Sequence, residues 1–500
     1  MKKCVTSFYS ACLCVLTVLS MLPSLRSETL ISAGAVSGTW ALTNSPYIVQ
    51  GTVNIQEGTT LTIEPGVVIR FAPSASMVVY GALTAAGTPL ETILFTSASS
   101  PAPGAWNGLQ INNLRGATHN VFRYVEINSA TTALNAVRER DDLGFTVTLA
   151  DSLIYSNAVN GLGVFCPSSF ISGEEVQITG SRIYHNGETG IYISSVTQGC
   201  SGSGNQTLIQ SNQIYRNGHF GVRVHAGASA VSGCLPRRTA TAYPSILANV
   251  LHNNASGGIG WSSSSGINNI VTAPSIMNNL VTSNGSHGIA VVGAVIMHNT
   301  VAHNSGPGID HGSIYHVQNN LVAHNTIGIR RWQEFPLDDR YIWCNNVFAN
   351  TLSNWTGYPE AVGTASTTNR NGTPADVYMN ISISPQFVGD RFTLRPTSPC
   401  VNAGVEYYTP PVDYEGQRRG AYPDIGYDEL LFRPTFLTPV IQGAFKTAVT
   451  GEPGVPWLIE ASSNLFSWAE IAVITNVTGS VFVTNELGPL QRFFRGKELP

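Results

Sequence analysis

Two short stretches of this sequence carry the residues best suited to chemistry. Asp310 and His311 form the first stretch, and Arg330, Arg331 and Trp332 form the second, twenty residues later. A carboxylate beside an imidazole can transfer protons, and guanidinium groups can bind an anionic group or neutralise it during a reaction. Alternatively, Asp310 and Arg330 face each other on adjacent strands as a structural ion pair, which would contribute roughly 1 kcal/mol or less.

The elements that carry these residues follow from a repeat. Eight times between residues 152 and 354 an Asn stands three residues after an aliphatic residue and five residues after another Asn or a Ser. A Gly follows four residues later in six of the eight copies. The repeated Asns are Asn157, Asn186, Asn217, Asn254, Asn284, Asn304, Asn325 and Asn350. Their spacings vary between 20 and 37 residues. This variation excludes a fixed-length helical repeat and predicts a parallel β-solenoid with insertions at its corners.

Stacked coils would place equivalent residues in columns about 4.8 Å apart. We expect the aliphatic residues to face inward. Each Asn should adopt the left-handed conformation of a tight corner and bond to the Asn of the next coil. Each Gly should supply a positive φ at the following corner.

Two further columns follow each Gly. The outward column contains Gly163, Tyr192, Arg223, Gly260, Ala290, Asp310 and Arg330. The inward column contains Val164, Ile193, Val224, Trp261, Val291, His311 and Arg331, so its apolar pattern ends at the last two members. We therefore take as candidate ligand-binding residues Arg223, Asp310, His311, Arg330, Arg331 and Trp332. No catalytic residue is assigned.

Aromatic and basic residues also recur at fixed places in the coils. Tyr155, Tyr184 and Tyr215 should stack on three successive coils, either as a strip for sugar rings or as a cross-strand aromatic ladder. The residues directly before four of the Asns are His185, Arg216, His303 and His324. We interpret them as a polar column facing solvent at a corner, because a metal site needs ligands that converge.

The composition indicates which partners the protein can bind, and the N-terminal residues indicate where it is located. Only 11% of the 500 residues are charged and the net charge is −4, which argues against a nucleic-acid partner. Residues 1–27 have the pattern of a signal peptide, with Lys2 and Lys3 before an apolar run too short to span a bilayer. We expect a secreted or cell-surface monomer, with no transmembrane segment after removal of the signal.

Five cysteines would remain after removal of the signal: Cys166, Cys200, Cys234, Cys344 and Cys400. The first three are spaced by 34 residues each and follow successive coils. One disulfide among them is compatible with an oxidising compartment, and free buried thiols are an equally good alternative.

The chain divides into three parts after the signal. Residues 28–432 should form the β-helix with N- and C-terminal caps, the second cap beginning at Ser384, where Pro and Gly end the regular coils. Residues 433–440 are interpreted as a linker. Residues 441–500 contain four short strand-like stretches and predict a small β-sandwich module. The fold class is therefore all-β.

Motifs outside the repeat point to a known class. The opening Gly-Thr-Thr-Leu-Thr-Ile-Glu-Pro-Gly at residues 58–66 and the closing Ser-Pro-Cys, Asn-Ala-Gly and Asp-Ile-Gly between residues 398 and 426 accompany the Asn and Gly repeat. Together they resemble secreted bacterial right-handed parallel β-helix proteins of the pectin-lyase-like class. Residues 441–500 resemble the small β-sandwich tails of exported bacterial proteins.

The resemblance implies where chemistry would occur. Members that cleave polysaccharide use a groove on the outside of the helix, where hydrolases need two carboxylates and lyases need a base with Ca²⁺ or Arg. Residues 309–311, Ile-Asp-His, resemble a pectate-lyase fragment whose Asp binds Ca²⁺. We expect no cofactor and no metal site, with Ca²⁺ as the one alternative that this fragment implies. The other motifs of that family are missing here.

Three functions are compatible with the sequence. We favour an exported β-helix protein that binds extracellular polysaccharide or cell-surface glycan without catalysis, because neither paired carboxylates nor a complete lyase constellation is present. The first alternative is a polysaccharide lyase or glycoside hydrolase acting on uronate-containing polymers. The second is a structural or adhesive envelope protein displayed through residues 441–500.

Overall fold

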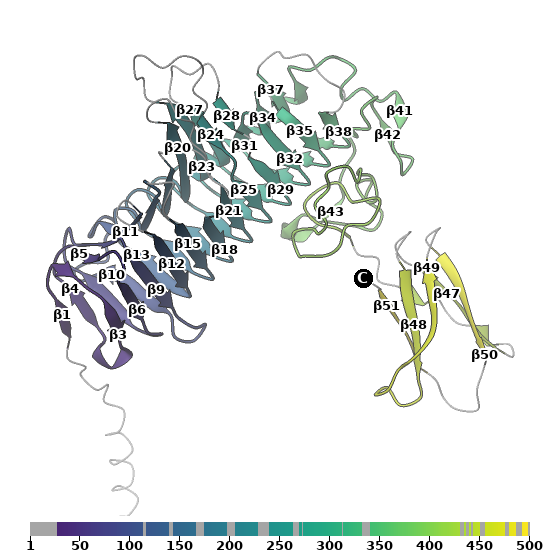
Figure 1. The fold of residues 1–500 in the computed structure, drawn as a ribbon. Coiled ribbons are helices and arrows are strands. Elements are labelled where there is room, and N and C mark those ends of the chain that lie inside the picture. The colour runs from purple at the N-terminus through teal and green to yellow at the C-terminus, as the bar shows by residue number, and fades with distance from the viewer. Residues whose placement is uncertain are drawn as a thin grey trace, which may run out of the picture.

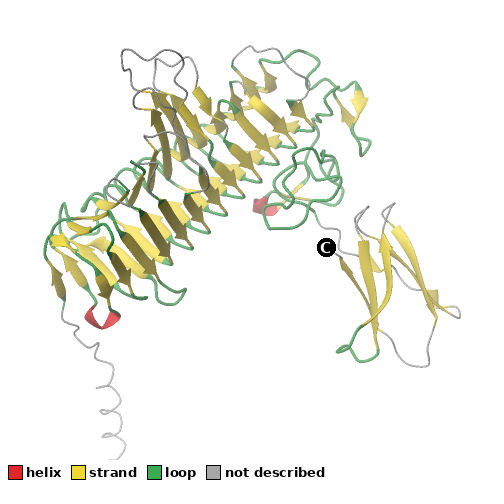
Figure 2. Cartoon of the chain, viewed as in Figure 1, coloured by secondary structure: helices red, strands yellow, loops and turns green. Residues whose placement is uncertain are grey.

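Most of the chain is wound into one long parallel β-helix (Figure 1; Figure 2). The computed structural model describes residues 28–113, 117–139, 144–166, 175–197, 206–228, 240–263, 270–272, 274–312, 314–332, 341–430, 435–436, 440–441, 444–450, 456–475, 480–486 and 493–498. The signal-peptide prediction and the thiols of Cys166, Cys200 and Cys234 fall outside the part that is described. Within the described residues, no helix has the length and apolar character needed to cross a bilayer.

The described strands of the β-helix form three parallel sheets, and the chain visits sheets C, A and B in turn in each coil. Sheet A contains β1 (Thr29–Ile31), β4 (Tyr47–Val49), β7 (Val68–Phe71), β10 (Ile93–Ser97), β13 (Val125–Asn128), β16 (Leu153–Tyr155), β19 (Arg182–Tyr184), β22 (Gln213–Tyr215), β26 (Val250–His252), β30 (Leu280–Thr282), β33 (Thr300–Ala302), β36 (Leu321–Ala323) and β39 (Asn346–Phe348). Sheet B contains β2 (Gly34–Ala35), β5 (Val53–Ile55), β8 (Ser76–Val79), β11 (Gly108–Asn112), β14 (Leu134–Val137), β17 (Leu162–Cys166), β20 (Ile191–Thr197), β23 (Phe220–Ala228), β27 (Gly257–Ser263), β31 (His287–Val291), β34 (Pro307–His311), β37 (Ile327–Arg331) and β40 (Ser353–Thr356). Sheet C contains β3 (Gly38–Trp40), β6 (Thr60–Ile63), β9 (Ala82–Ala86), β12 (Thr118–Arg123), β15 (Phe145–Ala150), β18 (Val176–Thr179), β21 (Thr207–Gln210), β25 (Ser245–Leu247), β29 (Ser275–Met277), β32 (Ala294–Met297), β35 (Ile314–Gln318) and β38 (Ile342–Trp343).

The core is the column of aliphatic residues that the repeat predicts. Ile183 pairs in register with Ile214, which pairs with Leu251 on the next coil, and all three are fully buried. Branched aliphatic side chains suit this place because they pack well on a pleated surface. The inward assignment of the repeated aliphatic residues is therefore confirmed.

Stacking is reinforced by two continuous ladders of asparagine amides. In the first ladder each Nδ2 donates to the Oδ1 of the Asn in the next coil, from Asn157 to Asn350, at 2.9–3.1 Å. A second ladder, which the sequence analysis did not predict, runs in the same way from Asn212 to Asn380 at 2.9–3.1 Å. Because these amides are buried at the corners, each donor needs such a partner.

The predicted backbone conformation of the Asn is wrong. The left-handed residue is the one before it, as at His185 (φ 54°), Arg216 (φ 53°) and His303 (φ 56°). The reason is that the Asn side chain must point inward to bond with the next coil, so the bend is taken by a neighbour whose side chain faces solvent. These three residues are exposed, and the fourth member of the predicted polar corner column, His324, is half-buried, so the column faces solvent at three of its four positions.

The predicted role of the repeated Gly is also wrong, because these residues do not have positive φ. Their importance is steric. A Cβ on Gly190 would lie 2.6 Å from the carbonyl oxygen of Gly221 and 2.8 Å from Ile214 Cγ2. Absence of a side chain therefore allows adjacent coils to approach at this corner.

The chain beyond the last coil follows a different path from the expected cap. Asn380 ends the second ladder, and Ile381 accepts a hydrogen bond from Val347 N, so these residues cover the last coil. Residues 384–430, here called the return segment, then run back along the outside of the β-helix (Figure 1). The return segment contains β43 (Phe387–Val388), η3 (Gly389–Arg391) and β44 (Thr393–Leu394).

Small antiparallel sheets follow at the C-terminal end. One sheet joins β45 (Thr435–Phe436), β46 (Val440–Ile441), β47 (Ala444–Thr450) and β50 (Ser480–Glu486), and another joins β48 (Pro456–Ser462), β49 (Ala469–Thr475) and β51 (Phe493–Glu498). These strands contain the stretches predicted at residues 457–462, 472–475 and 481–484 and all but the first residue of the stretch predicted at residues 492–495, and that first residue lies outside the described part of the chain. Shorter pieces elsewhere are η2 (Leu42–Asn44), β24 (Ala240–Ala242), β28 (Ile270–Thr272), β41 (Thr367–Thr368) and β42 (Pro374–Ala375).

The inward column gives a direct test of the fold. Ile214→Asp should lower the free energy of unfolding by more than about 4 kcal/mol, because it places a carboxylate without a partner in an apolar core. Ile214→Val, which removes one methylene group, should cost only about 1 kcal/mol. Urea unfolding followed by circular dichroism checks both values, and an unchanged curve for the Asp variant would contradict the inward assignment.

Candidate functional site

The outward face of sheet B places Asp310 in a closed ion-pair network. Arg330 Nε lies 2.8 Å from Asp310 Oδ1 and Arg330 Nη2 lies 2.7 Å from Oδ2, while His287 Nε2 lies 3.1 Å from Oδ2. Asp310 is 6% exposed. Burial alone would raise its pKa, but the hydrogen bonds with Arg330 and His287 outweigh burial and lower the pKa to about 2. Asp310 therefore remains ionised and is a poor general acid.

This network does not fit the Ca²⁺ site that the pectate-lyase fragment implies. Calcium takes six or more oxygen ligands. Both carboxylate oxygens of Asp310 already accept hydrogen bonds from the guanidinium of Arg330, and a guanidinium at this distance would repel a divalent cation.

His311 and Arg331 belong to a second, inward-facing group. His311 is completely buried, and its Nδ1 donates to the carbonyl oxygen of Gly312 at 2.7 Å, so its Nε2 accepts from the Tyr358 hydroxyl. The Arg331 guanidinium lies 5.4 Å from the centre of the Tyr358 ring. Burial lowers the His311 pKa to about 4, so the imidazole is neutral at pH 7. Trp332, which follows, is 48% exposed.

Arg223 lies apart from both groups. It pairs in register with Tyr192 on one side and Gly260 on the other. Its guanidinium lies 5.9 Å from the centre of the Tyr192 ring, and its Nε lies 3.3 Å from Ser262 Oγ. The structure therefore separates the six candidate residues into different surroundings instead of bringing them into one site, and their binding role stays a prediction.

Sheet A offers a better site because its outward face changes character along the helix. On the two coils of β19 and β22 the outward residues are polar or aromatic, as with Arg182, Gln213 and Tyr215. On later coils they become apolar, as with Leu321 and Ala323. The apolar part is covered by the return segment, whose Leu394, Val401 and Ile425 pack against it.

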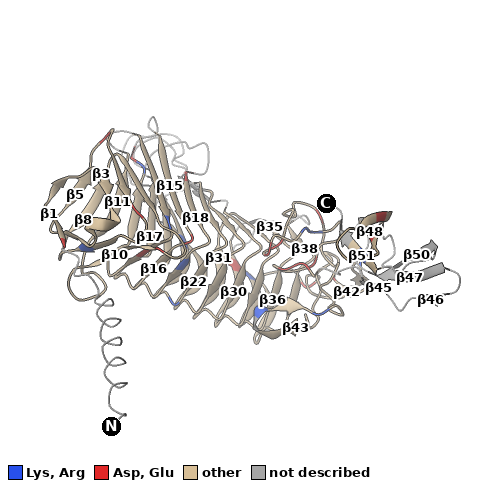
Figure 3. Cartoon of the chain, turned by 90° about the horizontal axis from the view of Figure 1, so that it is seen from below, with Lys and Arg blue, Asp and Glu red and all other residues tan. Residues whose placement is uncertain are grey.

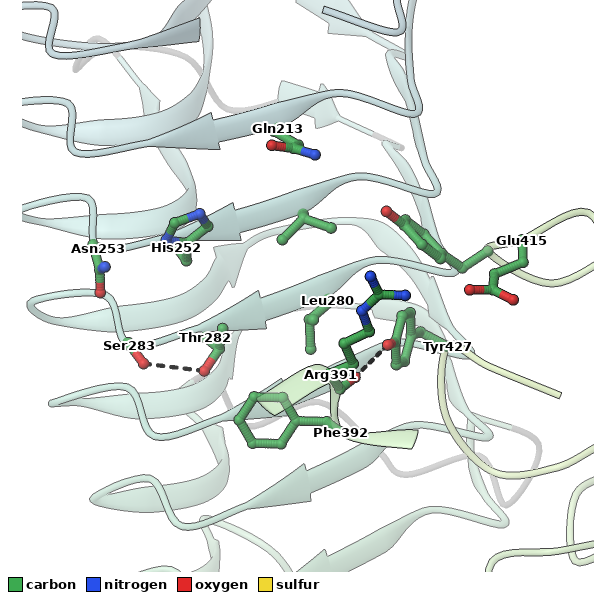
Figure 4. Close-up of a pocket in the computed structure, with 12 residues that line it drawn as sticks. Gln213, His252, Asn253, Leu280, Thr282, Ser283, Arg391, Phe392, Glu415 and Tyr427 are labelled. Carbon is green, nitrogen blue, oxygen red and sulfur yellow. Dashed lines mark hydrogen bonds between the residues drawn. The ribbon is translucent and has the colours of Figure 1, made fainter. Parts of the chain in front are cut away.

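A cleft of about 650 Å³ opens where the uncovered and covered parts of sheet A meet (Figure 4). Sheet A and its corners supply one wall, with Gln213, Val250, His252, Asn253, Leu280, Thr282 and Ser283. The return segment supplies the other wall, with Arg391, Phe392, Tyr414, Glu415 and Tyr427. In Figure 4 the Arg391 and Phe392 side chains lie beside Leu280 and Thr282.

The groups in the cleft are suited to binding alcohols. Burial, and then the charge of Arg216, lower the pKa of His252, so its imidazole is neutral at pH 7 and has one donor and one acceptor nitrogen. The Tyr427 hydroxyl donates to the main-chain oxygen of Arg391, which fixes the wall and leaves the exposed guanidinium available. Burial is the main cause that raises the pKa of Tyr414, and this hydroxyl therefore remains protonated.

Family comparisons agree with the geometry of the coils. Residues 107–295 match the model described as right handed beta helix region, and residues 34–134 match the model described as pectate-lyase like beta helix domain. This chain has a right-handed, pectate-lyase-like β-helix fold. The predicted fold class is therefore confirmed.

Several solved structures resemble this β-helix. The A-module of the Azotobacter vinelandii mannuronan C-5 epimerase AlgE4 is 16% identical, with 66% of this chain and 87% of that chain covered and a TM-score of 0.40. The periplasmic alginate epimerase AlgG is 13% identical, with 67% and 82% covered and a TM-score of 0.36. A capsular polysaccharide depolymerase, the tailspike gp49 of Acinetobacter baumannii bacteriophage Fri1, is 10% identical, with 86% and 73% covered and a TM-score of 0.26.

One curated protein matches a short part of this chain. Protein bark beetle of Drosophila melanogaster is 43% identical over 58 residues, which is 12% of this chain and 2% of that protein. The chain thus spans a very small fraction of the length of this relative.

Buried polar contacts hold the return segment against the β-helix. Arg419 Nη1 donates to Glu429 Oε2 at 2.8 Å, and its Nη2 donates to Asn278 Oδ1 at 2.9 Å at a corner of the coils. Carboxylates outnumber cations here, and burial followed by repulsion from Asp413 raises the pKa of Asp428 to about 7. This anchor positions the second wall of the cleft.

The cleft does not contain any of the six predicted site residues, because all six lie on or directly after the strands of sheet B. One available signal was the change on sheet A. After Arg182 and Gln213 this outward column continues with Val250, Leu280, Thr300 and Leu321, and its mostly apolar later part indicates that another part of the chain covers those coils. The sequence did not indicate which part covers them.

The Asp310 network predicts a specific dependence of stability on pH. Because the folded-state pKa lies near 2, below the ordinary value of 3.8, its stabilisation is present above about pH 4 and is lost as the pH falls toward 2. Asp310→Asn should lower the free energy of unfolding at pH 7 by about 1–2 kcal/mol, a figure that allows for the partly exposed Arg330.

Urea unfolding is measured at pH 7 and at about pH 2.5–3, which is close to the shifted pKa. The difference in free energy of unfolding between the Asp310→Asn protein and the unaltered protein should be smaller at the acidic pH. Asp151→Asn is the matched control, since Asp151 pairs with Arg123 in an exposed ion pair at 3.0 Å. Equal stability of the Asp310→Asn protein and the unaltered protein at pH 7 would contradict a stabilising role for the network.

Proposed function

We propose that this protein is an exported glycan-binding protein that holds part of a polysaccharide chain in the cleft between sheet A and the return segment. The observation that supports the proposal is the mixed lining of this cleft. Export rests on the pattern of residues 1–27.

Sugars combine hydroxyl groups with apolar C–H faces, and the cleft contains partners for both. Gln213, Asn253 and Thr282 offer amide and hydroxyl groups, and neutral His252 adds a donor and an acceptor. The ring of Phe392 supplies an apolar surface against which a C–H face can pack. Ligand sites commonly combine apolar walls with a few polar groups in this way.

The lining favours binding over hydrolysis. Glycoside hydrolysis usually requires two carboxylates that flank the scissile bond. Among the twelve lining residues, Glu415 is the single acid. Charged residues are also thinly distributed over the strands (Figure 3), which suits a largely neutral contact with a polymer.

A second candidate function, a polysaccharide lyase, is favoured by one observation. The neutral imidazole of His252 and the guanidinium of Arg391 line the same cleft. A lyase needs a base to remove the proton beside a uronate carboxyl group and a cation to neutralise that group. His252 would be the base and Arg391 the neutralising cation.

Binding in the cleft predicts the effect of two substitutions. Phe392→Ala and Arg391→Ala should each weaken binding of glycans selected on an array by about tenfold, because each removes a contact from the wall of the return segment. Arg395→Ala, an exposed arginine of the same segment outside the cleft lining, should leave affinity unchanged. Calorimetry measures the affinities, and unchanged binding in both cleft variants would refute the proposal.

The lyase candidate predicts an additional signal. Incubation with pectate, alginate or other uronate polymers should produce unsaturated uronates that absorb ultraviolet light, and His252→Ala should abolish this signal. His185→Ala is a control histidine on an exposed corner. If none of the uronate polymers gives an increase in ultraviolet absorbance, the protein is not a lyase of these polymers, and the proposal of non-catalytic binding is unaffected.

A further inference from the structure

A file of stacked rings leads along sheet A into the cleft. The ring centres of Tyr155 and Tyr184 are 5.0 Å apart, those of Tyr184 and Tyr215 are 5.0 Å apart, and those of Tyr215 and His252 are 4.9 Å apart. His252 also lines the cleft (Figure 4). The ring file and the cleft are therefore continuous.

The orientation of the rings determines what the file can bind. Successive ring planes are inclined by only 10°, 1° and 3°, so each ring covers the face of the next. Solvent consequently meets the edges of the rings, and for a tyrosine this edge carries the hydroxyl. This geometry confirms the aromatic ladder and leaves little ring surface for sugars to stack on.

Two hydroxyls of the file are available to a ligand. The Tyr155 hydroxyl is bonded to Glu126, and it accepts from Asn128 at 3.2 Å. In the part of the chain that the structure describes, the hydroxyls of Tyr184 and Tyr215 make no hydrogen bond. Burial, and then the neighbouring Tyr215, raise the pKa of Tyr184, so its hydroxyl remains a donor at physiological pH.

Two longer polar side chains accompany these hydroxyls. Arg182 and Gln213 are paired in register on β19 and β22, two residues before Tyr184 and Tyr215, and both are exposed. Alternation along a strand places residues two apart on the same face of the sheet. Each of these two coils therefore presents one tyrosine hydroxyl and one extended polar group to solvent.

We infer that the uncovered part of sheet A is a track that continues the cleft and holds an extended, equatorially linked pyranose chain parallel to the helix axis. The rise per residue of such a chain is close to the spacing of about 4.8 Å between hydrogen-bonded strands. One sugar then lies over each coil. The hydroxyl groups of one sugar bond to Arg182 and Tyr184, and those of the next sugar bond to Gln213 and Tyr215.

This inference rests on the proposed glycan binding in the cleft and adds the class of polymer and its direction. A chain in which each linkage joins an axial to an equatorial bond, as in α-1,4-linked glucose, curves away from a straight row of groups and would reach the cleft alone. Extended chains should therefore gain affinity with length, whereas curved chains should not.

The experiment compares disaccharides with hexasaccharides of β-1,4-linked glucose, β-1,4-linked mannose and β-1,4-linked mannuronate, measured by calorimetry. Extended hexasaccharides should bind about tenfold more tightly than their disaccharides, a difference of about 1.4 kcal/mol. The combined variant Tyr184→Phe with Tyr215→Phe should remove most of this gain and leave disaccharide affinity unchanged. These substitutions keep the stacked rings, so the melting temperature should not change.

Controls separate the track from the cleft. Phe392→Ala should weaken binding of both lengths, Tyr422→Phe at an exposed tyrosine elsewhere should have no effect, and α-1,4-linked glucose should show no gain with length. If the length gain is absent, or survives the double variant while Phe392→Ala still weakens binding, the track is wrong and the cleft proposal stands. If Phe392→Ala and Arg391→Ala both have no effect but the double variant lowers hexasaccharide affinity, the cleft proposal fails. Absence of binding to every extended oligomer would overturn both.

Discussion

The hydrogen bond between one asparagine amide and the next is the constraint on which the architecture depends. Each Nδ2 donates to the Oδ1 of the following coil, and that Oδ1 also accepts from the preceding Asn backbone N–H, as between Asn254 and Asn284. If one coil shifted by one residue relative to the next, buried amide donors of the asparagine ladder would lose their partners. Each buried donor without a partner destabilises the fold. Side chains at equivalent positions of successive coils are therefore neighbours. The outward-facing side chains consequently stack in the same register as the asparagines.

Register explains what the sequence could predict. The period identifies which residues stack, so the inward position of Ile214 and the pairing of Asp310 with Arg330 follow from counting. Counting does not provide dihedral angles or clearances. For that reason the repeat predicts the left-handed conformation at the Asn instead of at the residue before it, and it predicts a turn at Gly190, where the absence of a side chain instead makes room for the carbonyl oxygen of Gly221.

The cleft could not be predicted from the sequence for a different physical reason. Its second wall depends on contacts such as that between Arg419 and Asn278, which are 141 residues apart in the sequence. A repeat pattern contains no information about such pairs. The conspicuous polar side chains of Asp310 and His311, by contrast, are bonded within the fold, whereas the hydroxyls of Tyr184 and Tyr215 remain open to solvent. A polar group can bind a ligand only if the fold leaves it without a hydrogen-bond partner. The sequence alone does not reveal which groups these are.

The anchoring of the return segment has a consequence for how this protein can change in evolution. The segment is attached at Asn278, Thr300 and Asn319, whereas the tyrosine hydroxyls belong to coils that precede these attachment points. Duplication of a coil before Val250 would lengthen the binding surface by one strand spacing and leave the enclosed site unchanged. Duplication among the anchoring coils would instead pull the attachment points apart. The solenoid can therefore adjust to ligands of different length from its N-terminal side alone.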